Sequence, residues 1–344
     1  MTDSVIRAYV ENRTGIVELN RPQALNSLNL EMVTIISKHM SIWEADPDID
    51  QILIYSNSKA FCAGGDVRLA REYIIAGDPE RADEFFRAEY AMNAQIHHCT
   101  KPYIALIDGV AMGGGLGISV HGSHRIISEN ALAAMPEMAI GFIPDVGVAY
   151  MAQRMVGQRG FASPALARFM LLSGWHLGPA DLLWSGFATH YVEHADMEGV
   201  RSAIIAHGID QALDRYARPV KGESELARFA EAIEEVFSAA EWPDIERRLT
   251  AYPELAERFD TLTKVASPTS MIAALELLTR SQEASTIEEE LRLEERLGAY
   301  QRQHPDFAEG VRAVLVDKTR DASFCPAHID NVDKDAIKAA LELS

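Results

Sequence analysis

The chain has 344 residues, of which 48% are apolar and 24% charged, a composition typical of globular proteins with a sizeable buried core. It carries 32 Lys and Arg against 51 Asp and Glu, so the formal net charge is −19, which argues against nucleic acid as a partner. No apolar stretch reaches the length of a membrane span, and the N-terminal sequence MTDSVIRAYVENR resembles neither a secretory signal nor a transit peptide. We therefore expect a cytoplasmic protein with no membrane partner. Cys62, Cys99 and Cys325 are widely spaced, so neither a disulfide framework nor a zinc site is predicted.

The first half of the chain alternates short β-rich runs with Gly and Pro, which predicts strands separated by turns and helices. The predicted strands are Ile6–Val10, Ile16–Leu19, Ile52–Tyr55, Tyr103–Ile107, Arg125–Ile127 and Thr189–Val192. From about Asp196 onward the pattern is helical, with helix starts at Ser267-Pro268 and at the capping box Thr286-Ile-Glu-Glu289. We expect an α/β core over residues 1–195 and a helical region over residues 196–344.

Several familiar motifs are incomplete. The glycines of Gly113–Gly117 follow a predicted strand but do not fit the dinucleotide pattern G-x-G-x-x-G. The stretch Gly117-Ile-Ser119-Val-His121 resembles a nucleophile elbow until its last position, so Ser119 is predicted to be a helix residue. His97-His98-Cys99 are adjacent and diverge around a helix, which indicates helix-end polarity rather than a metal site.

Two glycine-rich segments each lie just beyond a predicted strand. They are Phe61-Cys-Ala-Gly64-Gly65-Asp66 and Asp108-Gly-Val-Ala-Met-Gly113-Gly114-Gly115, and a helix is expected to begin at the second. Glycine lets the backbone approach a ligand closely, and two N–H groups converging on one point would form an oxyanion hole. The alternative is that both segments are tight turns required for packing.

Three acidic residues are candidates for chemistry. Glu137 and Asp145 each follow a proline inside an apolar segment, where loss of hydration would raise the pKa of a carboxyl group and make it a better base near neutral pH. Glu137 could instead be an exposed loop residue, and Asp145 the N-cap of a helix over Val146–Val156. Glu89, one helical turn from Phe85, is by itself typical of a solvated helix position.

Taken together, these segments resemble the crotonase (enoyl-CoA hydratase/isomerase) superfamily, and within it the 3-hydroxyisobutyryl-CoA hydrolases. The resemblance spans about residues 16 to 326. It is carried by Leu19-Asn20-Arg21-Pro22…Leu25-Asn26, Phe61–Asp66, Phe85-Phe-Arg-Ala-Glu89-Tyr, Gly113–Gly122, Pro136-Glu137, Pro144-Asp145-Val-Gly147, Gly186–Val192, Ser267–Ser270 and Asp306–Lys318.

The resemblance implies a spiral of ββα units, with C-terminal helices that cover the site and often mediate trimer or hexamer contacts. It implies that an acyl-CoA thioester carbonyl sits between the backbone N–H groups of Gly65 and Gly114. Hydratases of this superfamily use a second catalytic glutamate at the position of Gly117, and they usually carry glycine in place of Asp145. The hydrolase branch matches Glu89, Glu137 and Asp145.

The implied reaction is hydrolysis of 3-hydroxyisobutyryl-CoA, a step of valine catabolism, with no metal or other cofactor because CoA belongs to the substrate. Glu137 would be the nucleophile or the base that activates water, and the sequence leaves both open. Asp145 would position the substrate hydroxyl or the water, and Glu89 would bind the polar acyl end or its water. Arg21, Arg68 and Lys318 are candidates for the CoA phosphates.

One departure and two rival functions stand beside this interpretation. The hydrolase pattern usually continues with glycines after Gly147, whereas this chain has Val148-Ala149, which predicts an altered substrate pocket. The rivals are a hydratase or isomerase of the same superfamily, which Gly117 disfavours, and a catalytically silent acyl-CoA-binding protein.

Overall fold

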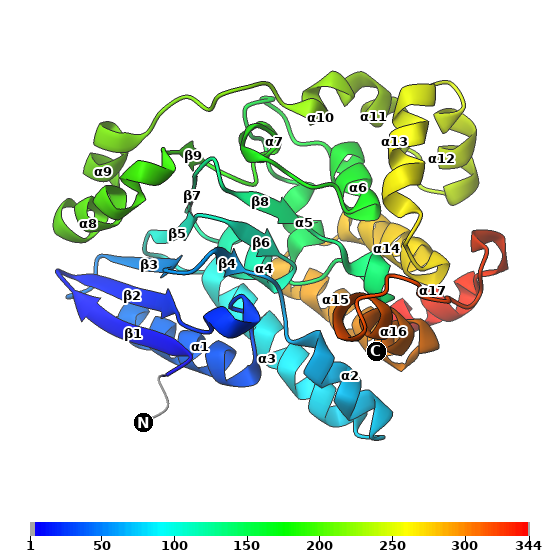
Figure 1. Cartoon of the computed structure of the whole chain (residues 1–344), viewed down its shortest axis with the longest axis horizontal. Coiled ribbons are helices and arrows are strands. Elements are labelled where there is room, and N and C mark those ends of the chain that lie inside the picture. Colours follow the sequence, from blue (N-terminus) through cyan, green and yellow to red (C-terminus); the bar gives the residue numbers. More distant parts are fainter. Residues whose placement is uncertain (1–3, 343–344) are drawn as a thin grey trace.

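The computed structural model describes residues 4–342, and its centre is a six-stranded sheet (Figure 1). The strand order is β1-β2-β3-β5-β7-β9, in which β1 and β2 are antiparallel and the remaining neighbours are parallel. The bounds are β1 Ile6–Glu11, β2 Thr14–Leu19, β3 Gln51–Ser56, β5 Tyr103–Ile107, β7 His124–Ile127 and β9 His190–Tyr191. All six strands predicted from the sequence are confirmed, with small shifts at their ends.

A second, three-stranded parallel sheet was missed by the sequence prediction. It consists of β4 (Ala60–Cys62), β6 (Val110–Met112) and β8 (Leu132–Ala134). Each follows a strand of the larger sheet after a short turn. The pairs β3-β4, β5-β6 and β7-β8 therefore each cross from the larger sheet to the smaller one in the same way. With the helices that follow β4 and β6, this gives the strand–strand–helix spiral that the resemblance implied.

The inner strands β2, β3 and β5 are buried on both faces because helices cover both faces, whereas the edge strand β1 is largely exposed. Ile16, Leu53 and Ile104 pack against α8 (Met197–His207) and α9 (Ile209–Tyr216). Val17 and Ile54 point the other way, into the main core. A strand buried on both sides is expected to be nearly continuous in hydrophobic residues, as these are.

The remaining helices surround the two sheets (Figure 1). The helices of the core are α1 Leu30–Ala45, α2 Val67–Ile75, α3 Pro79–His97, α4 Gly114–Val120, α5 Val148–Ala152, α6 Pro164–Ser173 and α7 Pro179–Ser185. The later helices are α10 Glu225–Arg228, α11 Ala230–Phe237, α12 Trp242–Leu249, α13 Pro253–Thr263, α14 Pro268–Ser281, α15 Ile287–Gln303, α16 Pro305–Val311 and α17 Lys334–Glu342. The helical character expected from about residue 196 is confirmed, whereas the division at residue 195 stays a prediction.

The last helices return to the front of the core. In Figure 1, α15 and α16 lie beside α2 and α3, and they pack against these helices. Helix α16 also packs on a 3-10 turn, Glu137–Ile140. Residues distant in sequence are thereby brought next to the loops that follow the smaller sheet.

Two predicted helix starts are confirmed, one with a difference. The Ser267 hydroxyl accepts from the Ser270 N–H at 3.1 Å, and the Thr286 hydroxyl accepts from the Glu289 N–H at 3.3 Å. The Glu289 carboxylate, however, accepts from Ser285 N–H at 2.6 Å rather than from Thr286 N–H, so the capping box closes one residue early. Over residues 4–342, no helix is long and apolar enough to cross a membrane.

Candidate active site

A cleft of about 780 Å³ opens where the chain leaves β4 and β6. It is lined by both glycine segments and by all three acidic candidates, together with apolar side chains such as Phe86, Met112 and Phe142. Val314, Leu315 and Lys318 line it from the C-terminal side. The catalytic and binding candidates thus share one cavity, built from six separate parts of the chain.

The backbones of the two glycine segments approach each other closely in this cleft. A Cβ added to Gly114 would lie 3.2 Å from the Gly65 backbone nitrogen. Gly64 and Gly113, with φ of +115° and +48°, turn the chain in conformations that suit glycine. Within residues 4–342, neither Gly65 N–H nor Gly114 N–H donates a hydrogen bond to another backbone group. Two neighbouring donors are therefore available to a single acceptor in the cleft.

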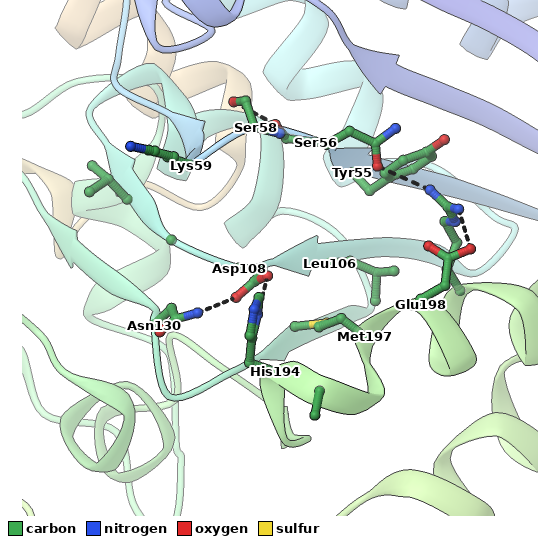
Figure 2. A pocket seen from close by; sticks show the side chains of 15 residues that line it. Tyr55, Ser56, Ser58, Lys59, Leu106, Asp108, Asn130, His194, Met197 and Glu198 are labelled. Carbon is green, nitrogen blue, oxygen red and sulfur yellow. Dashed lines mark hydrogen bonds and ion pairs between the residues drawn. The ribbon is translucent and has the colours of Figure 1, made fainter.

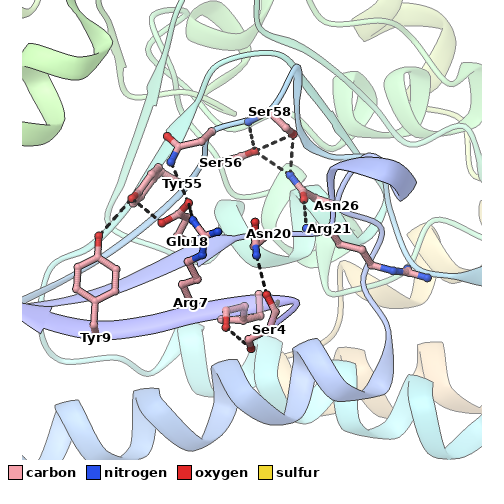
Figure 3. Close-up of polar contacts among 12 residues, drawn as sticks. Ser4, Arg7, Tyr9, Glu18, Asn20, Arg21, Asn26, Tyr55, Ser56 and Ser58 are labelled. Carbon is pink, nitrogen blue, oxygen red and sulfur yellow. Dashed lines mark hydrogen bonds and ion pairs between the residues drawn. The ribbon is translucent and has the colours of Figure 1, made fainter. Parts of the chain in front are cut away.

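Asn26 holds the strand that leads into the first glycine segment, and Figure 3 shows its side chain hydrogen-bonded to Ser56 and Ser58. Its side chain is fully buried, and its amide group donates to the carbonyls of Ala60 and Phe61 at 3.1 and 3.0 Å. Its oxygen accepts from the Arg21 N–H at 2.8 Å. The motif around Asn26 thus acts as a structural support for the loop that carries Gly65, a role that the sequence analysis did not assign.

Glu137 begins the 3-10 turn Glu137–Ile140 and lies next to the second glycine segment. Its Oε1 lies 2.8 Å from where a Cβ on Gly113 would stand, so a side chain at Gly113 would displace the carboxylate from this position. The residue is only 7% exposed, and its Oε2 has no hydrogen-bond partner among the described residues. The interpretation of Glu137 as an exposed loop residue is wrong.

Glu89 and Asp145 complete a group of three buried carboxyls. Glu89 lies on α3 and is 2% exposed, and its Oε1 would collide with a Cβ added to Gly114. Asp145 is also buried, and its Oδ2 accepts from the Tyr90 hydroxyl at 2.8 Å. The solvated-helix interpretation of Glu89 is therefore wrong.

The interpretation of Asp145 as an N-cap is also wrong. Helix α5 begins at Val148 and is preceded by Gly147 as its cap residue, with no side-chain capping hydrogen bond. The predictions for the nucleophile-elbow-like stretch and for His97 are confirmed. Ser119 is buried in α4, where its hydroxyl donates to the Gly115 carbonyl, and His97 is the last residue of α3.

Burial and mutual repulsion raise the pKa values of all three carboxyls. Burial raises the pKa of Glu89 and of Glu137 well above the ordinary range, and the charge of Asp145 raises both further. Burial also raises the pKa of Asp145 to about 7, although the Tyr90 hydroxyl and the Arg302 guanidinium oppose the shift. Since three buried carboxyls cannot all be charged at low cost, the group holds protons near neutral pH.

Sequence reasoning missed Tyr90 and Arg302. Arg302 comes from α15 and is buried, with its guanidinium 4.1 Å from the centre of the Phe86 ring and its Nε donating to Asp83 at 2.9 Å. Tyr90 directly follows Glu89 in a motif already singled out, which was an available signal. Nothing near Arg302 in the sequence indicates a site.

The three basic candidates all line the cleft. Arg21 is held in place, since its guanidinium pairs with Asp66 at 2.8 Å and donates to the Ser27 carbonyl at 2.9 Å. Arg68 lies at the start of α2, and Lys318 follows the π-helical turn Arg312–Val316. Positive charge is therefore available at the cleft in a strongly acidic chain.

A second cavity, of about 680 Å³, lies at the turns between the two sheets and contains none of these candidates (Figure 2). Its polar side chains satisfy one another: the Asp108 carboxylate pairs with His194 at 2.7 Å, and Arg201 donates to Asn57 at 3.1 Å. Asp108, which opens the second glycine segment, faces this cavity rather than the cleft. Within residues 4–342, no group of three or more His, Cys, Asp or Glu side chains is placed to hold a metal ion.

The chain is similar in sequence and in fold to known proteins. The family profile described as enoyl-CoA hydratase/isomerase matches residues 14–341. The chain is 38% identical over 336 residues to the mitochondrial 3-hydroxyisobutyryl-CoA hydrolase of Xenopus tropicalis, covering 94% of this chain and 85% of that protein. The chain belongs to the enoyl-CoA hydratase/isomerase family. The human mitochondrial 3-hydroxyisobutyryl-CoA hydrolase is 36% identical over 349 residues, covering 97% of this chain and 88% of that protein.

Two solved structures of similar proteins carry different activity names. A carnitinyl-CoA dehydratase from Mycobacterium thermoresistibile superposes with a TM-score of 0.91 at 33% identity, over 99% of this chain and 97% of that one. An enoyl-CoA hydratase from Rhodobacter sphaeroides 2.4.1 superposes with a TM-score of 0.88 at 31% identity, over 98% of this chain and 97% of that one. These comparisons confirm the fold. The names of the similar proteins include both hydrolases and hydratases, so the choice between these two reactions depends on the residues of the site.

Position 117 bears on that distinction, because the resemblance implies a second catalytic glutamate there in hydratases. A Cβ on Gly117 would lie 2.8 Å from the Val146 Cβ and 3.0 Å from the Asn93 Nδ2, so the space beside it is filled. A glutamate could not point into the cleft from here without moving Val146. Val148 and Ala149 are both buried in α5 and neither lines the cleft, so the altered pocket expected from them stays a prediction.

A second buried acidic pair, Glu290 and Glu294 on α15, predicts an unusual dependence of stability on pH. Burial raises the pKa of Glu290 from 4.5 to about 7. Between these values the folded state binds more protons than the unfolded state, so stability falls as pH rises. We expect Glu290→Gln to raise the Tm at pH 8 by about 2–4 °C or more.

Thermal unfolding of both proteins at several pH values measures this effect. At pH 4, where the carboxyl is protonated in either state, the two Tm values should nearly coincide. A Tm difference that stays constant between pH 4 and pH 8 would contradict the raised pKa of Glu290.

Proposed function

We propose that this protein hydrolyses a short-chain 3-hydroxyacyl-CoA thioester, first of all 3-hydroxyisobutyryl-CoA, giving 3-hydroxyisobutyrate and CoA. One observation carries the proposal: Glu137 stands beside two free backbone donors, while Gly117 leaves no room for a second glutamate. The names of the relatives that are 38% and 36% identical support the same substrate. The resemblance implies that the reaction is a step of valine catabolism.

The first role belongs to the two glycines. The thioester carbonyl oxygen would accept hydrogen bonds from Gly65 N–H and Gly114 N–H, which stabilise the negative charge that develops as the carbonyl carbon becomes tetrahedral. A donor of this kind contributes about 3–4 kcal/mol of transition-state stabilisation. Burial of the site strengthens the effect because water does not compete for the donors.

Glu137 would supply the remaining chemistry in one of two ways. As a nucleophile, its carboxylate attacks the carbonyl carbon, the C–S bond breaks, the CoA thiolate leaves and is protonated, and water hydrolyses the resulting mixed anhydride. As a base, it removes a proton from a water molecule that attacks the same carbon. Both routes add one water across the C–S bond, and both stay open.

The other two carboxyls would orient the substrate. Asp145, fixed by the Tyr90 hydroxyl, can accept a hydrogen bond from the substrate 3-hydroxyl or from the attacking water. Glu89, whose raised pKa favours the neutral acid, can donate to the polar acyl end or its water. Arg21, Arg68 and Lys318 are proposed for the CoA phosphates. The proposed reaction uses no metal or redox cofactor, because CoA arrives with the substrate.

Hydration of an enoyl-CoA is the second candidate, favoured by the names of the two similar structures. Its usual second glutamate has no counterpart here, since Gly117 is packed against Val146. A silent acyl-CoA-binding protein is the third candidate. Such a protein would not require three buried carboxyls next to the glycine donors, and each of these carboxyls lowers the stability of the fold at neutral pH.

A panel of four thioesters separates these functions. Purified protein is given 3-hydroxyisobutyryl-CoA, 3-hydroxypropionyl-CoA, isobutyryl-CoA and crotonyl-CoA, and free thiol and enoyl absorbance are followed separately. We expect thiol release from the two 3-hydroxyacyl esters. Isobutyryl-CoA should react at least about 10-fold more slowly, because buried polar groups arranged for a hydroxyl are left unpaired by the deoxy analogue.

Loss of enoyl absorbance without thiol release would instead establish hydration, and binding without any turnover would establish the silent protein. The oligomeric state suggested by the resemblance and the cytoplasmic location both stay predictions, and the vertebrate relatives compared here are mitochondrial by name.

A further inference from the structure

A single peptide group beside the cleft is held on both sides by buried side chains. The Val146 carbonyl accepts from His121 Nε2 at 2.7 Å. The Gly147 N–H lies 2.9 and 3.1 Å from the two carboxyl oxygens of Glu294. These two backbone groups belong to one peptide unit, Val146–Gly147, which is separated from Asp145 by one peptide bond.

The backbone at this point needs support. Val146 has φ of +55° and Gly147 has φ of +74°, so two consecutive residues are left-handed. A β-branched residue such as valine strongly disfavours this region and adopts it only where the surrounding structure imposes it. Val146 also packs against Gly117, so the same turn fills the space next to the cleft and aims Asp145 into it.

The two partners come from distant elements and are themselves buried. His121 is the C-cap residue of α4, the helix that begins at Gly114, and Glu294 lies in the middle of α15. His121 is 6% exposed and Glu294 is fully buried. No Cβ fits at Gly147, because it would lie 2.7 Å from the His121 ring. The peptide is therefore fixed relative to both the Gly114 helix and the C-terminal helices.

We propose that His121 and Glu294 are positioning residues, which act together through the Val146–Gly147 peptide to hold Asp145 in its working place. This proposal rests on the proposed function, because it assumes that Asp145 orients the substrate or the water.

We call the Val146–Gly147 peptide together with His121 and Glu294 the clamp. The protonation states of the two side chains determine which hydrogen bonds it can form. To donate to a carbonyl, His121 must carry its proton on Nε2, and burial lowers its pKa to about 4, which keeps the ring neutral. Burial raises the pKa of Glu294 well above the ordinary range, and the charges of Glu290 and Asp145, which face it, raise it further. A neutral carboxyl still accepts from Gly147 N–H, so a hydrogen-bond acceptor rather than a charge is needed.

Paired substitutions test this requirement. Glu294→Gln keeps an acceptor, whereas Glu294→Leu removes it and leaves the Gly147 N–H unpaired. His121→Gln keeps a donor, whereas His121→Phe removes it. With 3-hydroxyisobutyryl-CoA, we expect the Leu and Phe variants to lose about 10- to 100-fold in kcat with KM within about threefold, and the Gln variants to stay near wild type. The double variant His121→Phe/Glu294→Leu should lose less than the product of the single losses, because both act on one peptide.

Hydrogen–deuterium exchange of residues 141–150 in substrate-free protein gives a readout independent of turnover. Exchange there should speed up in the Leu and Phe variants and stay slow in the Gln variants. Asp181→Asn is the matched control: it removes another buried carboxyl, on α7, which does not line the cleft and whose hydrogen-bond partners are Trp175, Ser224 and Leu226, so both kcat and exchange should be unchanged.

Three results would overturn the clamp: a folded Glu294→Leu or His121→Phe variant with wild-type kcat, equal losses in Glu294→Gln and Glu294→Leu, or unchanged exchange in the variants that lack a partner. If Glu294→Leu does not fold, His121→Phe and the exchange data decide. If wild type hydrolyses none of the thioesters, the proposed function fails, and exchange alone still decides whether the clamp exists.

Discussion

The Glu137→Gln variant is expected to lose at least about 100-fold in kcat for thioester hydrolysis. Glutamine keeps the shape of the side chain but can neither accept a proton nor attack the carbonyl carbon, so both possible roles of Glu137 are lost together. Substrate binding should change little, because the residue lies at the reacting end of the cleft. Steady-state rates of thiol release over a range of substrate concentrations measure both quantities.

The Glu290→Gln variant is a suitable control, since it also removes one buried carboxyl with a raised pKa but does not line the cleft. Wild-type kcat/KM should in addition rise with pH as Glu137 loses its proton, with a midpoint well above the ordinary value for a glutamate. A Glu137→Gln variant that keeps most of its turnover rate would exclude Glu137 as the catalytic group.

The Gly114→Ala variant should be almost as damaging. The new Cβ would lie 3.2 Å from the Gly65 nitrogen and would collide with Glu89 Oε1, so it would cover one donor, shift the other and displace a carboxyl. Removing one oxyanion donor costs about 10²- to 10³-fold in kcat. We expect a loss of that size, measured again as thiol release.

Gly178→Ala provides the matched control, because a Cβ at Gly178 meets nothing within 4 Å. The near-ultraviolet circular dichroism of Gly114→Ala should match that of wild type if this glycine serves the chemistry rather than the packing. A folded Gly114→Ala variant with normal kcat would show that the glycine pair is only a tight turn.

Much of the fold could be predicted because its long strands are buried on both faces. Runs such as Ile52–Tyr55 and Tyr103–Ile107 are continuously apolar, and that pattern survives without any knowledge of tertiary contacts. The strands of the smaller sheet could not be found in this way. Each has three residues and stands next to glycine or a turn, so its identity depends on the neighbouring strand rather than on its own sequence.

The candidate site was predictable where its residues lie in compact motifs. Glu137, Asp145, Gly65 and Gly114 were each found beside Pro or Gly, although the residues alone left a structural interpretation open for every one of them. The burial of these residues in one cleft favours the functional interpretation over the structural one, and burial cannot be read from a single sequence.

The supporting residues were missed because their effect is non-local. Glu294 contacts Gly147 across 147 positions, and Arg302 contacts Asp83 across 219. Each lies in a helix whose local sequence is an ordinary alternation of charged and apolar residues. The packing of α15 against α3 and α5 brings Glu294 to Gly147 and Arg302 to Phe86, which lines the cleft.

The crystal structure of the Glu137→Gln variant with bound 3-hydroxyisobutyryl-CoA is the most direct single measurement. The thioester carbonyl oxygen should accept hydrogen bonds from both Gly65 N–H and Gly114 N–H, with the substituted side chain at position 137 beside the carbonyl carbon and the substrate hydroxyl at Asp145 or Glu89. A carbonyl oxygen bound away from the two glycines, or an acyl group seated in the cavity of Figure 2, would contradict thioester hydrolysis in this cleft.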